Sequence, residues 1–378
     1  MKEKLINFDV IIIGGGLAGL CSAIHLSKFN KKVLLIEKNE YPKHKVCGEY
    51  ISNEVLPYLE FLTINPFNFG AVKINKFQLS TTKGNLISAK LPLGGFGISR
   101  YKLDFELSKK AIKKGVTILK DSVLNVDYFS DSFLIQTKEN KTYTSKITIG
   151  AFGKRSLLDV KMNRNFIQKK SPYLGVKLHV KGDFPEDLVA LHNFKGGYCG
   201  VSKVENNAIN LCYITNFSSF KKYKNIDDFQ NKVVFKNSFL KEIFNTSEAV
   251  FEKPLTISQV SFKTKKPVEN HILMCGDSAG MIHPLCGNGM SMAIQSAQMA
   301  SKLILNYLNG ELNSRNELEK QYIRQWNKKF SFRLKTGHFI ALLFRKDKIA
   351  AILLQVLKKL PFLLPIIIKQ THGKLMKV

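Results

Sequence analysis

The stretch DVIIIGGGLAGLCSAIHL, residues 9–26, decides the fold. Two interpretations compete for an apolar run behind a short basic start: a secretion signal, or the first turn of a nucleotide-binding fold. A signal peptide needs an unbroken apolar segment and then a small-residue cleavage site. Here three consecutive glycines follow the β-branched residues 10–13, which favours a buried parallel strand ending in a tight turn. We therefore expect a fold to begin here and no signal peptide.

The glycines Gly14, Gly16 and Gly19 have the spacing G-x-G-x-x-G. In a dinucleotide-binding unit the first glycine permits the turn, the second lets the backbone approach a pyrophosphate, and the third lets the helix pack closely on the strand. We predict a helix over residues 17–29, with its N-terminal amides and dipole facing the phosphates. The alternative is a glycine-rich turn in an ordinary parallel sheet.

An acid follows the next predicted strand, residues 32–36. Glu37 lies about twenty residues beyond the glycines, the spacing of the ribose-binding acid in such units. Its carboxylate can accept hydrogen bonds from both hydroxyls of an adenosine ribose. With strand, helix, strand and acid in register, the sequence predicts dinucleotide binding.

Composition places the chain among large globular proteins. Its 378 residues allow two or three domains at about 150 residues each. A hydrophobic content of 44% with 27 phenylalanines excludes a disordered protein. The six cysteines are scattered without C-x-x-C pairs, which indicates a reducing cytoplasm and no structural metal.

The net charge of +29, from 58 basic and 29 acidic side chains, favours anionic partners such as nucleic acid, lipid headgroups or phosphorylated substrates. The alternative explanation for the charge is an AT-rich genome, because lysine, asparagine and isoleucine are all abundant in this chain. No run of basic residues with interleaved aromatics marks an RNA surface, so we expect no nucleic-acid partner.

The hydrophobic pattern changes along the chain. Residues 72–91 and most of residues 166–265 alternate as strands do, with one helical segment near residues 226–244. Residues 53–62 and 103–114 are predicted helices. A β-rich domain is thus inserted into the predicted nucleotide-binding domain. No second G-x-G-x-x-G follows a strand, which excludes reductases with two separate dinucleotide domains.

A second glycine-rich motif follows a predicted strand at residues 272–274. Asp277, at the strand end, is placed to accept hydrogen bonds from a sugar-alcohol chain lying across the sheet. The chain then reads Pro284, Gly287 and Gly289 before a long predicted helix from Met290. These glycines bring backbone close to a flat group, and the positive helix end would stabilise negative charge on it, as on a reduced flavin.

Together these residues resemble the flavoprotein hydroxylase superfamily with the p-hydroxybenzoate hydroxylase fold and, within it, the geranylgeranyl reductase-like branch. The "K-x-C-G" stretch of that branch is similar to residues 45–48, and its "R-x-x-[LF]-D" to residues 100–104. Its "G-D-A-A-G-x-x-x-P-x-x-G-x-G" is similar to residues 276–289, with Ser278 in place of the first alanine. The resemblance covers almost all of residues 8–310.

The resemblance implies FAD as cofactor, with Arg100 near it, Asp277 on the ribityl chain and residues 287–290 at the isoalloxazine. The implied binding residues are Gly14, Gly16, Leu17, Ala18, Gly19, Glu37, Lys38, Cys47, Arg100, Val123, Gly153, Asp277, Pro284, Gly287, Gly289 and Met290.

The implied fold class is α/β: a Rossmann-like FAD-binding domain of the p-hydroxybenzoate hydroxylase type, with an inserted antiparallel substrate domain and C-terminal helices. The FAD-binding domain would comprise residues 1–71, 96–165 and 266–310. Residues 72–95 and 166–265 would form the substrate domain, and residues 311–378 the helical region.

Two departures from the family pattern bear on the reaction. The middle motif "A-D-G-x-x-S" reads here Ala151-Phe152-Gly153-Lys154-Arg155-Ser156, and phenylalanine cannot make the hydrogen bonds of aspartate. The reductase stretch "Y-x-W-x-F-P" corresponds to Tyr198-Cys199-Gly200-Val201-Ser202, which lacks the large aromatics after Tyr198. This second departure favours hydroxylation over alkene reduction.

Three residues are candidates for catalysis. Cys47 is either a flavin-facing thiol or a small buried hydrophobe. His283 could donate a proton or serve only as a hydrogen-bonding spacer, and Tyr198 could face the substrate chemically or by packing. For Glu49, beside Cys47, we favour a helix-capping carboxylate over an acid in the pocket.

The C-terminal segment, residues 339–378, contains the apolar run IAAILLQVLKKLPFLLPIII. Lys358 and Lys359 interrupt it and Pro361 and Pro365 break it, so we expect no transmembrane helix. Its lysines frame apolar faces, as in a helix lying on anionic lipid. A helical lid over the substrate is the favoured alternative, and a peripheral contact with the inner face of the membrane is the other.

We therefore predict a cytoplasmic FAD-dependent oxidoreductase, in which the protein supplies binding and electrostatics while the flavin reacts. An NAD(P)H-using monooxygenase of a hydrophobic aromatic, polyketide-like or isoprenoid molecule is favoured. The first alternative is a geranylgeranyl reductase-like enzyme that reduces alkenes of isoprenoid lipids. The second is a non-catalytic, membrane-associated protein with a degenerate flavin fold.

Overall fold

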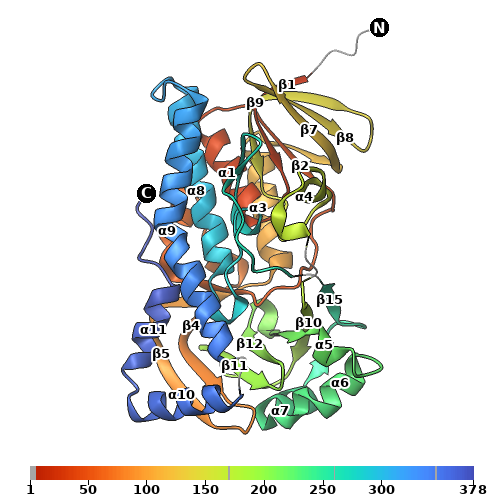
Figure 1. The fold of residues 1–378 in the computed structure, drawn as a ribbon, viewed down its shortest axis with the longest axis vertical. Coiled ribbons are helices and arrows are strands. Elements are labelled where there is room, and N and C mark those ends of the chain that lie inside the picture. Colours follow the sequence, from red (N-terminus) through yellow and green to blue (C-terminus); the bar gives the residue numbers. More distant parts are fainter. Residues whose placement is uncertain (1–5, 169–170, 259, 345–346) are drawn as a thin grey trace.

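Two β-sheets, one above the other in Figure 1, organise the chain, and long helices run along one side of both. The computed structural model describes residues 6–168, 171–258, 260–344 and 347–378. The first sheet contains β1 (Ile6–Ile13), β2 (Val33–Glu37), β6 (Thr117–Lys120), β7 (Val123–Phe129), β8 (Ser132–Thr137), β9 (Thr142–Gly150), β16 (Val268–Glu269) and β17 (Ile272–Met274).

The first sheet has a parallel centre in the order β17-β9-β1-β2-β6, with β16 antiparallel at one edge. The β7/β8 hairpin joins it through β8 and β9. Every residue of β2 is buried, as expected for a parallel strand covered on both faces. The carboxyl ends of β1, β2 and β17 carry the first glycine loop, Glu37 and the second glycine-rich motif, so the parallel order brings these three to one edge.

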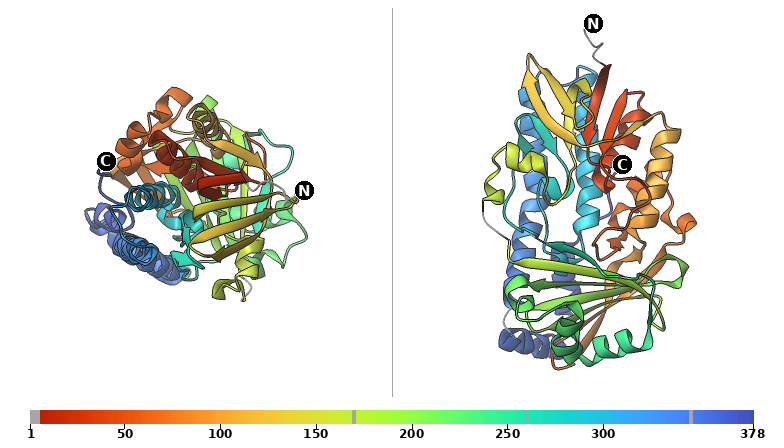
Figure 2. Two further views of the ribbon diagram at one scale, coloured as in Figure 1. Left: turned by 90° about the horizontal axis from the view of Figure 1, so that it is seen from above. Right: turned by 90° about the vertical axis from the view of Figure 1, so that its right-hand side faces the viewer.

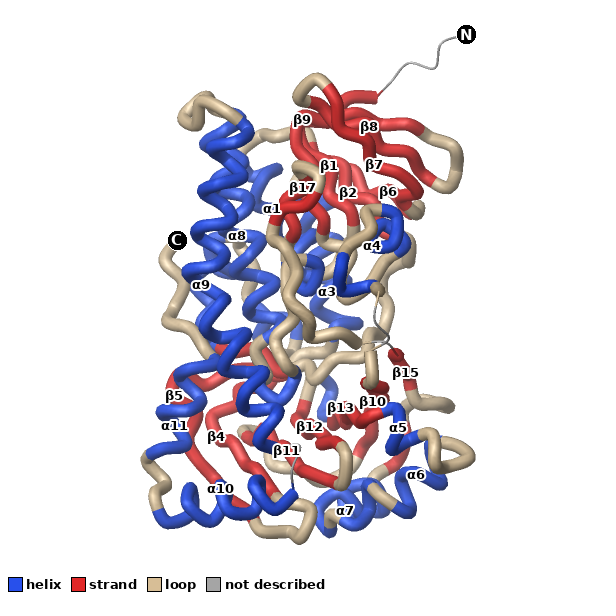
Figure 3. The backbone as a smooth tube through the Cα atoms, viewed as in Figure 1, coloured by secondary structure: helices blue, strands red, loops and turns tan. Residues whose placement is uncertain are grey.

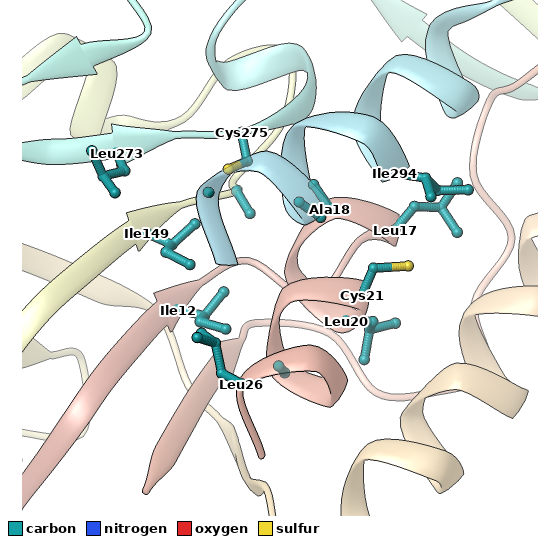
Figure 4. Packing of buried hydrophobic residues seen from close by; sticks show 14 of the residues in the cluster. Ile12, Leu17, Ala18, Leu20, Cys21, Leu26, Ile149, Leu273, Cys275 and Ile294 are labelled. Atoms are coloured by element: carbon teal, nitrogen blue, oxygen red, sulfur yellow. The ribbon is translucent and has the colours of Figure 1, made fainter. Parts of the chain in front are cut away.

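Two helices, α1 (Leu17–Lys28) and α8 (Gly289–Leu308), pack side by side against this sheet. Figure 4 shows Leu17 of α1 beside Ile294 of α8, with Ile12 and Ile149 of the strands to their left. A β-carbon added at Gly276 would lie 3.3 Å from those of Ala18 and of Ala293 on α8. Small residues therefore let the two helices approach closely next to both glycine motifs.

The second sheet crosses beneath the first, as the right-hand view of Figure 2 shows. Its path is β14-β10-β13-β12-β11-β4-β5-β3, with β15 also paired to β10. All pairs are antiparallel except β11 with β4. The strands are β3 (Tyr50–Ser52), β4 (Val72–Ser80), β5 (Leu86–Gly97), β10 (Tyr173–Lys181), β11 (Leu188–Phe194), β12 (Gly197–Lys203), β13 (Ile209–Asn216), β14 (Glu248–Ala249) and β15 (Leu255–Ser258).

The two faces of this sheet are covered by different helices. One face packs on α6 (Ile226–Lys232) and α7 (Ser238–Thr246), through side chains such as Val176 and Val201. Alternate residues, such as Tyr198, point to the opposite face. That opposite face is turned toward the first sheet and the C-terminal helices.

The C-terminal helices α9 (Arg315–Phe344), α10 (Asp347–Lys359) and α11 (Leu363–Thr371) descend from the first sheet and cover β4 and β5 (Figure 3). The remaining helices are α2 (Leu56–Phe61), α3 (Arg100–Lys113), α4 (Leu157–Lys161) and α5 (Phe217–Phe220). Among the described residues, we find no helix that combines the length and the apolar character needed to cross a bilayer.

The predicted elements differ from the observed ones mainly at their ends. The helix expected over residues 103–114 begins at Arg100, because the Ser99 hydroxyl caps it by accepting a hydrogen bond from the Lys102 amide, 3.0 Å away. The helix expected over residues 53–62 begins as a 3-10 turn, Asn53–Val55, and continues as α2. The predicted strand before Glu37 includes Glu37 itself.

Candidate cofactor and substrate site

The first glycine loop is held by contacts that need glycine. Gly14 has a φ of +104°, and a β-carbon there would overlap the carbonyl of Ala151 at the end of β9. One at Gly19 would overlap the carbonyl oxygen of Gly14. A β-carbon at Gly16 would meet only Nη2 of Arg100, at 3.4 Å. Gly16 thus faces open space beside a guanidinium, which suits a pyrophosphate.

Glu37 is buried at the end of β2 and fixes the neighbouring loop. Its Oε2 accepts a hydrogen bond from the Gly15 amide at 2.7 Å, and its Oε1 accepts from the Asn39 amide at 2.9 Å. The Tyr41 hydroxyl donates to the Gly15 carbonyl at 2.6 Å, a contact that sequence reasoning missed. Lys38 is exposed. The carboxylate stands at the ribose position that the motif predicts, already anchored to the glycine loop.

Arg100 belongs to a buried charge cluster formed by two of the sequence motifs. Its Nε and Nη2 donate to the Asp104 carboxylate at 2.8 and 2.7 Å, and Lys45 Nζ donates to the same carboxylate at 2.8 Å. Burial raises the pKa of Asp104, but the charges of Arg100 and Lys45 outweigh it and hold that pKa below the usual value. Two cations share one carboxylate, which leaves positive charge beside Gly16.

Glu49 is a helix-capping carboxylate, as the sequence predicts, and the helix that it caps is α3. It is fully buried with a φ of +54°, and its Oε1 accepts a hydrogen bond from the Arg100 amide at 2.8 Å. It therefore caps α3, whereas Ser52 caps the 3-10 turn that follows Glu49 in sequence. The approach of α3 to Glu49 is a tertiary contact, which sequence spacing does not reveal.

The same carboxylate pairs with two bases of β10. Lys177 Nζ donates to Oε1, and His179 Nε2 lies 2.7 Å from Oε2. Burial raises the pKa of Glu49, but the nearby Lys177 and His179 outweigh it and lower that pKa. Sequence reasoning missed both bases. The sequence pattern that could have revealed them is two basic residues at alternate positions of an otherwise apolar strand, because alternate residues lie on one face of a strand.

The second glycine-rich motif is fastened to the middle motif. The Gly153 amide donates to Ser278 Oγ at 2.8 Å. Lys265 Nζ donates to the carbonyls of Asp277 and Lys154, at 2.6 and 3.0 Å. Burial lowers the pKa of Lys265 to about 8. The replacement of alanine by Ser278 thus ties together the two loops that depart from the family pattern.

The Asp277 carboxylate makes no hydrogen bond with any described residue, and its side chain is half-buried. It follows β17 on the edge that carries Gly16 and Glu37. An accepting group without a protein partner at this place fits the sugar-alcohol chain that the motif implies.

The loop before α8 supplies a further buried acceptor. Pro284 begins a 3-10 turn, and Gly287 ends it with a φ of +63° beside the Tyr50 ring. Asn288 Nδ2 donates to the Thr371 carbonyl at 2.7 Å, whereas its Oδ1 is buried with no partner among the described residues. Gly289 and the buried Met290 then begin α8. The C-terminal segment therefore braces the loop expected at the isoalloxazine.

The three catalytic candidates lie over one face of the second sheet. The rings of Tyr198 and His283 are 6.2 Å apart, centroid to centroid. Cys47 lies over β13, where its carbonyl accepts a hydrogen bond from Asn210 Nδ2 at 3.2 Å. Burial lowers the pKa of His283 to about 4 and raises the pKa of Tyr198 well above its ordinary value. At neutral pH the imidazole is uncharged and the phenol keeps its proton.

Tyr198 lies in an apolar layer between the second sheet and the C-terminal helices. The layer contains Ile74, Leu79, Val189, Leu191, Tyr198 and Ile214 of the sheet, Met281 and Leu285 of the second glycine-rich motif, and Leu354, Leu357, Leu364 and Ile368 of α10 and α11. It extends from the flavin-loop side of the molecule to the terminal helices. Aliphatic side chains predominate among its buried residues.

Four glycines test whether a large flat cofactor fits. A β-carbon at Gly48 or Gly153 would meet nothing within 4 Å, one at Gly16 only Arg100, and one at Gly289 only Ile282 at 3.8 Å. These loops therefore face open space, while Leu17, Ala18 and Val123 are buried in the adjoining core. The arrangement fits FAD along the edge of the first sheet.

Comparisons with known proteins agree with this geometry. A family model for FAD-dependent oxidoreductases matches residues 9–46, and a squalene epoxidase model matches residues 233–343. Conditioned medium factor receptor 1 of Dictyostelium discoideum is 22% identical, over 85% of this chain and 68% of that protein. Digeranylgeranylglycerophospholipid reductase of Methanococcus vannielii is 25% identical, over 85% and 83%.

Solved structures share the fold. The flavin-dependent brominase Bmp2 superposes with a TM-score of 0.81 at 19% identity, over 98% of this chain and 94% of that one. PqsL of Pseudomonas aeruginosa, a probable FAD-dependent monooxygenase, superposes with a TM-score of 0.74 at 14% identity, over 91% and 98%.

Proposed function

We propose that this FAD-dependent oxidoreductase of the p-hydroxybenzoate hydroxylase-fold superfamily acts on a hydrophobic, isoprenoid-like molecule. The apolar layer carries this proposal. It joins Met281 and Leu285, next to the loop expected at the isoalloxazine, with Leu354 and Leu364 of the terminal helices. No ion pair between described residues lies within this layer. A long apolar substrate could contact it throughout its length.

The glycine motifs would hold the cofactor. Gly16 and Arg100 would face the pyrophosphate, Glu37 the ribose, Asp277 the ribityl chain, and residues 287–290 the isoalloxazine. FAD, when bound, supplies the two-electron exchange with the substrate. The chain contributes the positive charge near Gly16, the helix end at Gly289 and the exclusion of water by the apolar layer.

Alkene reduction is the reaction that we place first. A hydride and a proton add across the double bond, so the chain must hold a proton near the substrate. Tyr198 retains its proton on Oη, which has no partner among the described residues. The relatives that match over most of their length include reductases of isoprenoid lipids. This similarity outweighs the sequence-based preference for hydroxylation.

Hydroxylation of a hydrophobic ring, with NADH or NADPH as the electron donor, is the second candidate. The residues after Tyr198 favour it, because Cys199 to Ser202 lack the aromatics of the reductase stretch. Phe152 argues against the nicotinamide contact, since its side chain offers no hydrogen bond to a nucleotide.

Product analysis with the FAD-loaded protein distinguishes these reactions. Dithionite-reduced protein is mixed anaerobically with a geranylgeranyl lipid, and a second sample receives NADH or NADPH in air. Reduction predicts oxidised flavin and a product with two hydrogen atoms gained for each reduced double bond. Hydroxylation predicts one oxygen atom gained, only in air and only with a nucleotide. A protein that shows no flavin absorption after FAD addition would contradict both.

A further inference from the structure

The outward side of α10, α11 and the turn between them exposes large apolar side chains. We call this surface the apolar edge; it consists of Ile352, Val356, Leu360, Phe362, Ile366 and Ile367. Ile352 and Phe362 are each 60% exposed. Single exposed hydrophobic residues are ordinary, whereas six on two consecutive helices and the turn between them mark a surface that meets a partner.

The opposite side of the same helices is apolar as well. Leu354 and Leu357 of α10 and Leu364 and Ile368 of α11 are buried in the apolar layer. A helix that covers a protein core ordinarily turns polar residues to water. These two helices instead carry apolar residues on both sides, so their outer side also requires cover.

The positive charge of the C-terminal segment indicates which kind of partner covers the apolar edge. Residues 321–378 contain thirteen lysines and arginines and one acid, Asp347. Lys358, Lys359 and Lys369 are exposed next to the apolar edge in sequence. A second copy of the chain would bring like charges together, and an acidic protein surface would not bury six large hydrophobic side chains. Anionic lipid satisfies both requirements, with headgroups for the lysines and acyl chains for the apolar edge.

We propose that α10 and α11 dock in the plane of an anionic lipid bilayer through the apolar edge. The helices lie at one end of the molecule, away from the first sheet (Figure 1), so docking leaves the glycine motifs accessible to an electron donor. Each helix then separates the bilayer from the apolar layer. A lipid substrate would pass between membrane and enzyme at these helices; this last step alone rests on the proposed function.

Vesicle sedimentation with the purified full chain tests the docking. Large vesicles of phosphatidylcholine alone are compared with vesicles containing about one third phosphatidylglycerol, at low and high salt. We expect binding to the anionic vesicles that weakens as salt rises. The double variant Phe362→Asp/Ile366→Asp should reduce the partition coefficient at least about tenfold. Lys358→Glu/Lys359→Glu should reduce it on the order of fivefold or more for each charge removed.

Matched controls separate docking from general effects. Leu157→Asp/Val160→Asp makes the same changes at exposed residues of α4, and Lys113→Glu/Lys114→Glu at the exposed end of α3. Both should bind as the unchanged protein does. Retained flavin absorption and circular dichroism show that each variant is folded.

Three results would overturn the proposal: no binding to any vesicle, equal losses in the control variants, or light scattering that shows a dimer which Phe362→Asp/Ile366→Asp abolishes. Because vesicle binding needs no turnover, an enzyme of another reaction type would still dock. Failure of the proposed function is therefore distinguishable from failure of the docking.

Discussion

At the scale of single residues, Gly16 and Gly19 should separate cofactor binding from folding. A β-carbon at Gly16 has only Arg100 within reach, at 3.4 Å, whereas one at Gly19 overlaps the Gly14 carbonyl. Gly16→Ala should therefore fold normally but lose FAD affinity about tenfold or more, because its methyl group occupies the space beside the guanidinium. Gly19→Ala should lower the unfolding free energy by about 1–3 kcal/mol. Chemical denaturation and FAD titration measure the two effects, and equal behaviour of the variants would contradict this assignment.

Glu49 should determine part of the stability that the folded protein loses at low pH. Glu49→Gln leaves Lys177 buried without a counter-charge, which should cost about 3–5 kcal/mol at pH 7. The folded pKa of Glu49 lies below its ordinary 4.5, so the unfolded chain binds the proton first and stability falls as pH drops below that value. Because glutamine does not titrate, Glu49→Gln should lack the part of the stability loss at low pH that comes from protonation of Glu49. Glu40→Gln removes an exposed partner of Lys120 and should behave as the unchanged protein does in the same urea titrations.

The positions of residues in the fold were predictable from sequence where a motif is local. The spacing of Gly14, Gly16 and Gly19 and the placement of Glu37 required no tertiary information. The pairing of Lys45 with Asp104, 59 positions apart, and of Glu49 with Lys177, 128 apart, depends on how two sheets meet. No local periodicity encodes these contacts, so the sequence predicted a capping role for Glu49 but neither the helix that it caps nor its basic partners.

At the scale of elements, Lys265 should position the second glycine-rich motif. Its ammonium donates to the Asp277 and Lys154 carbonyls, so Lys265→Met should loosen Asp277 and weaken FAD binding about tenfold. Burial holds its pKa near 8 against 10.5 in the unfolded chain; the unfolded state binds more protons between these values, and stability contributed by this group rises with pH there. Lys265→Met should lack this rise of stability with pH. Lys266→Met, at an exposed neighbour, is the control in both the flavin titration and the pH series.

Helices and strands with a strong hydrophobic periodicity were predicted well, but their first and last residues were predicted less accurately. The alternation that predicts strands in residues 166–265 reflects a sheet with one face on α6 and α7 and the other on the apolar layer. The C-terminal helices fit both earlier interpretations in part: their inner residues cover the second sheet, and their outer residues remain apolar. A pattern that is apolar on both sides cannot by itself say which side meets protein.

At the scale of the whole molecule, the fold places the loops that we expect to hold the cofactor between the two sheets. The first loop follows β1, the cluster of Glu49 joins α3 to β10, and Thr371 braces Asn288. Four segments remote in sequence therefore converge on one site. This convergence follows from the crossing of the sheets (Figure 2), which the resemblance implied and which composition and spacing alone did not reveal.

Because the site is shared among these segments, FAD removal should destabilise the entire molecule. A ligand that binds only the folded state adds RT ln(1 + [L]/Kd), about 2.7 kcal/mol at a free concentration of about 100 Kd. The stripped protein should therefore unfold at a lower temperature, and its midpoint should rise with each increment of added FAD. Scanning calorimetry at several FAD concentrations measures this. Gly16→Ala, which keeps the fold but fills the space beside Arg100, should show a midpoint that FAD raises about half as much or less at the same concentrations, because a tenfold weaker affinity leaves about 1.4 kcal/mol of the stabilisation. A midpoint that FAD leaves unchanged in the original protein would instead mean that the open space at Gly16, Gly48 and Gly153 does not receive the cofactor.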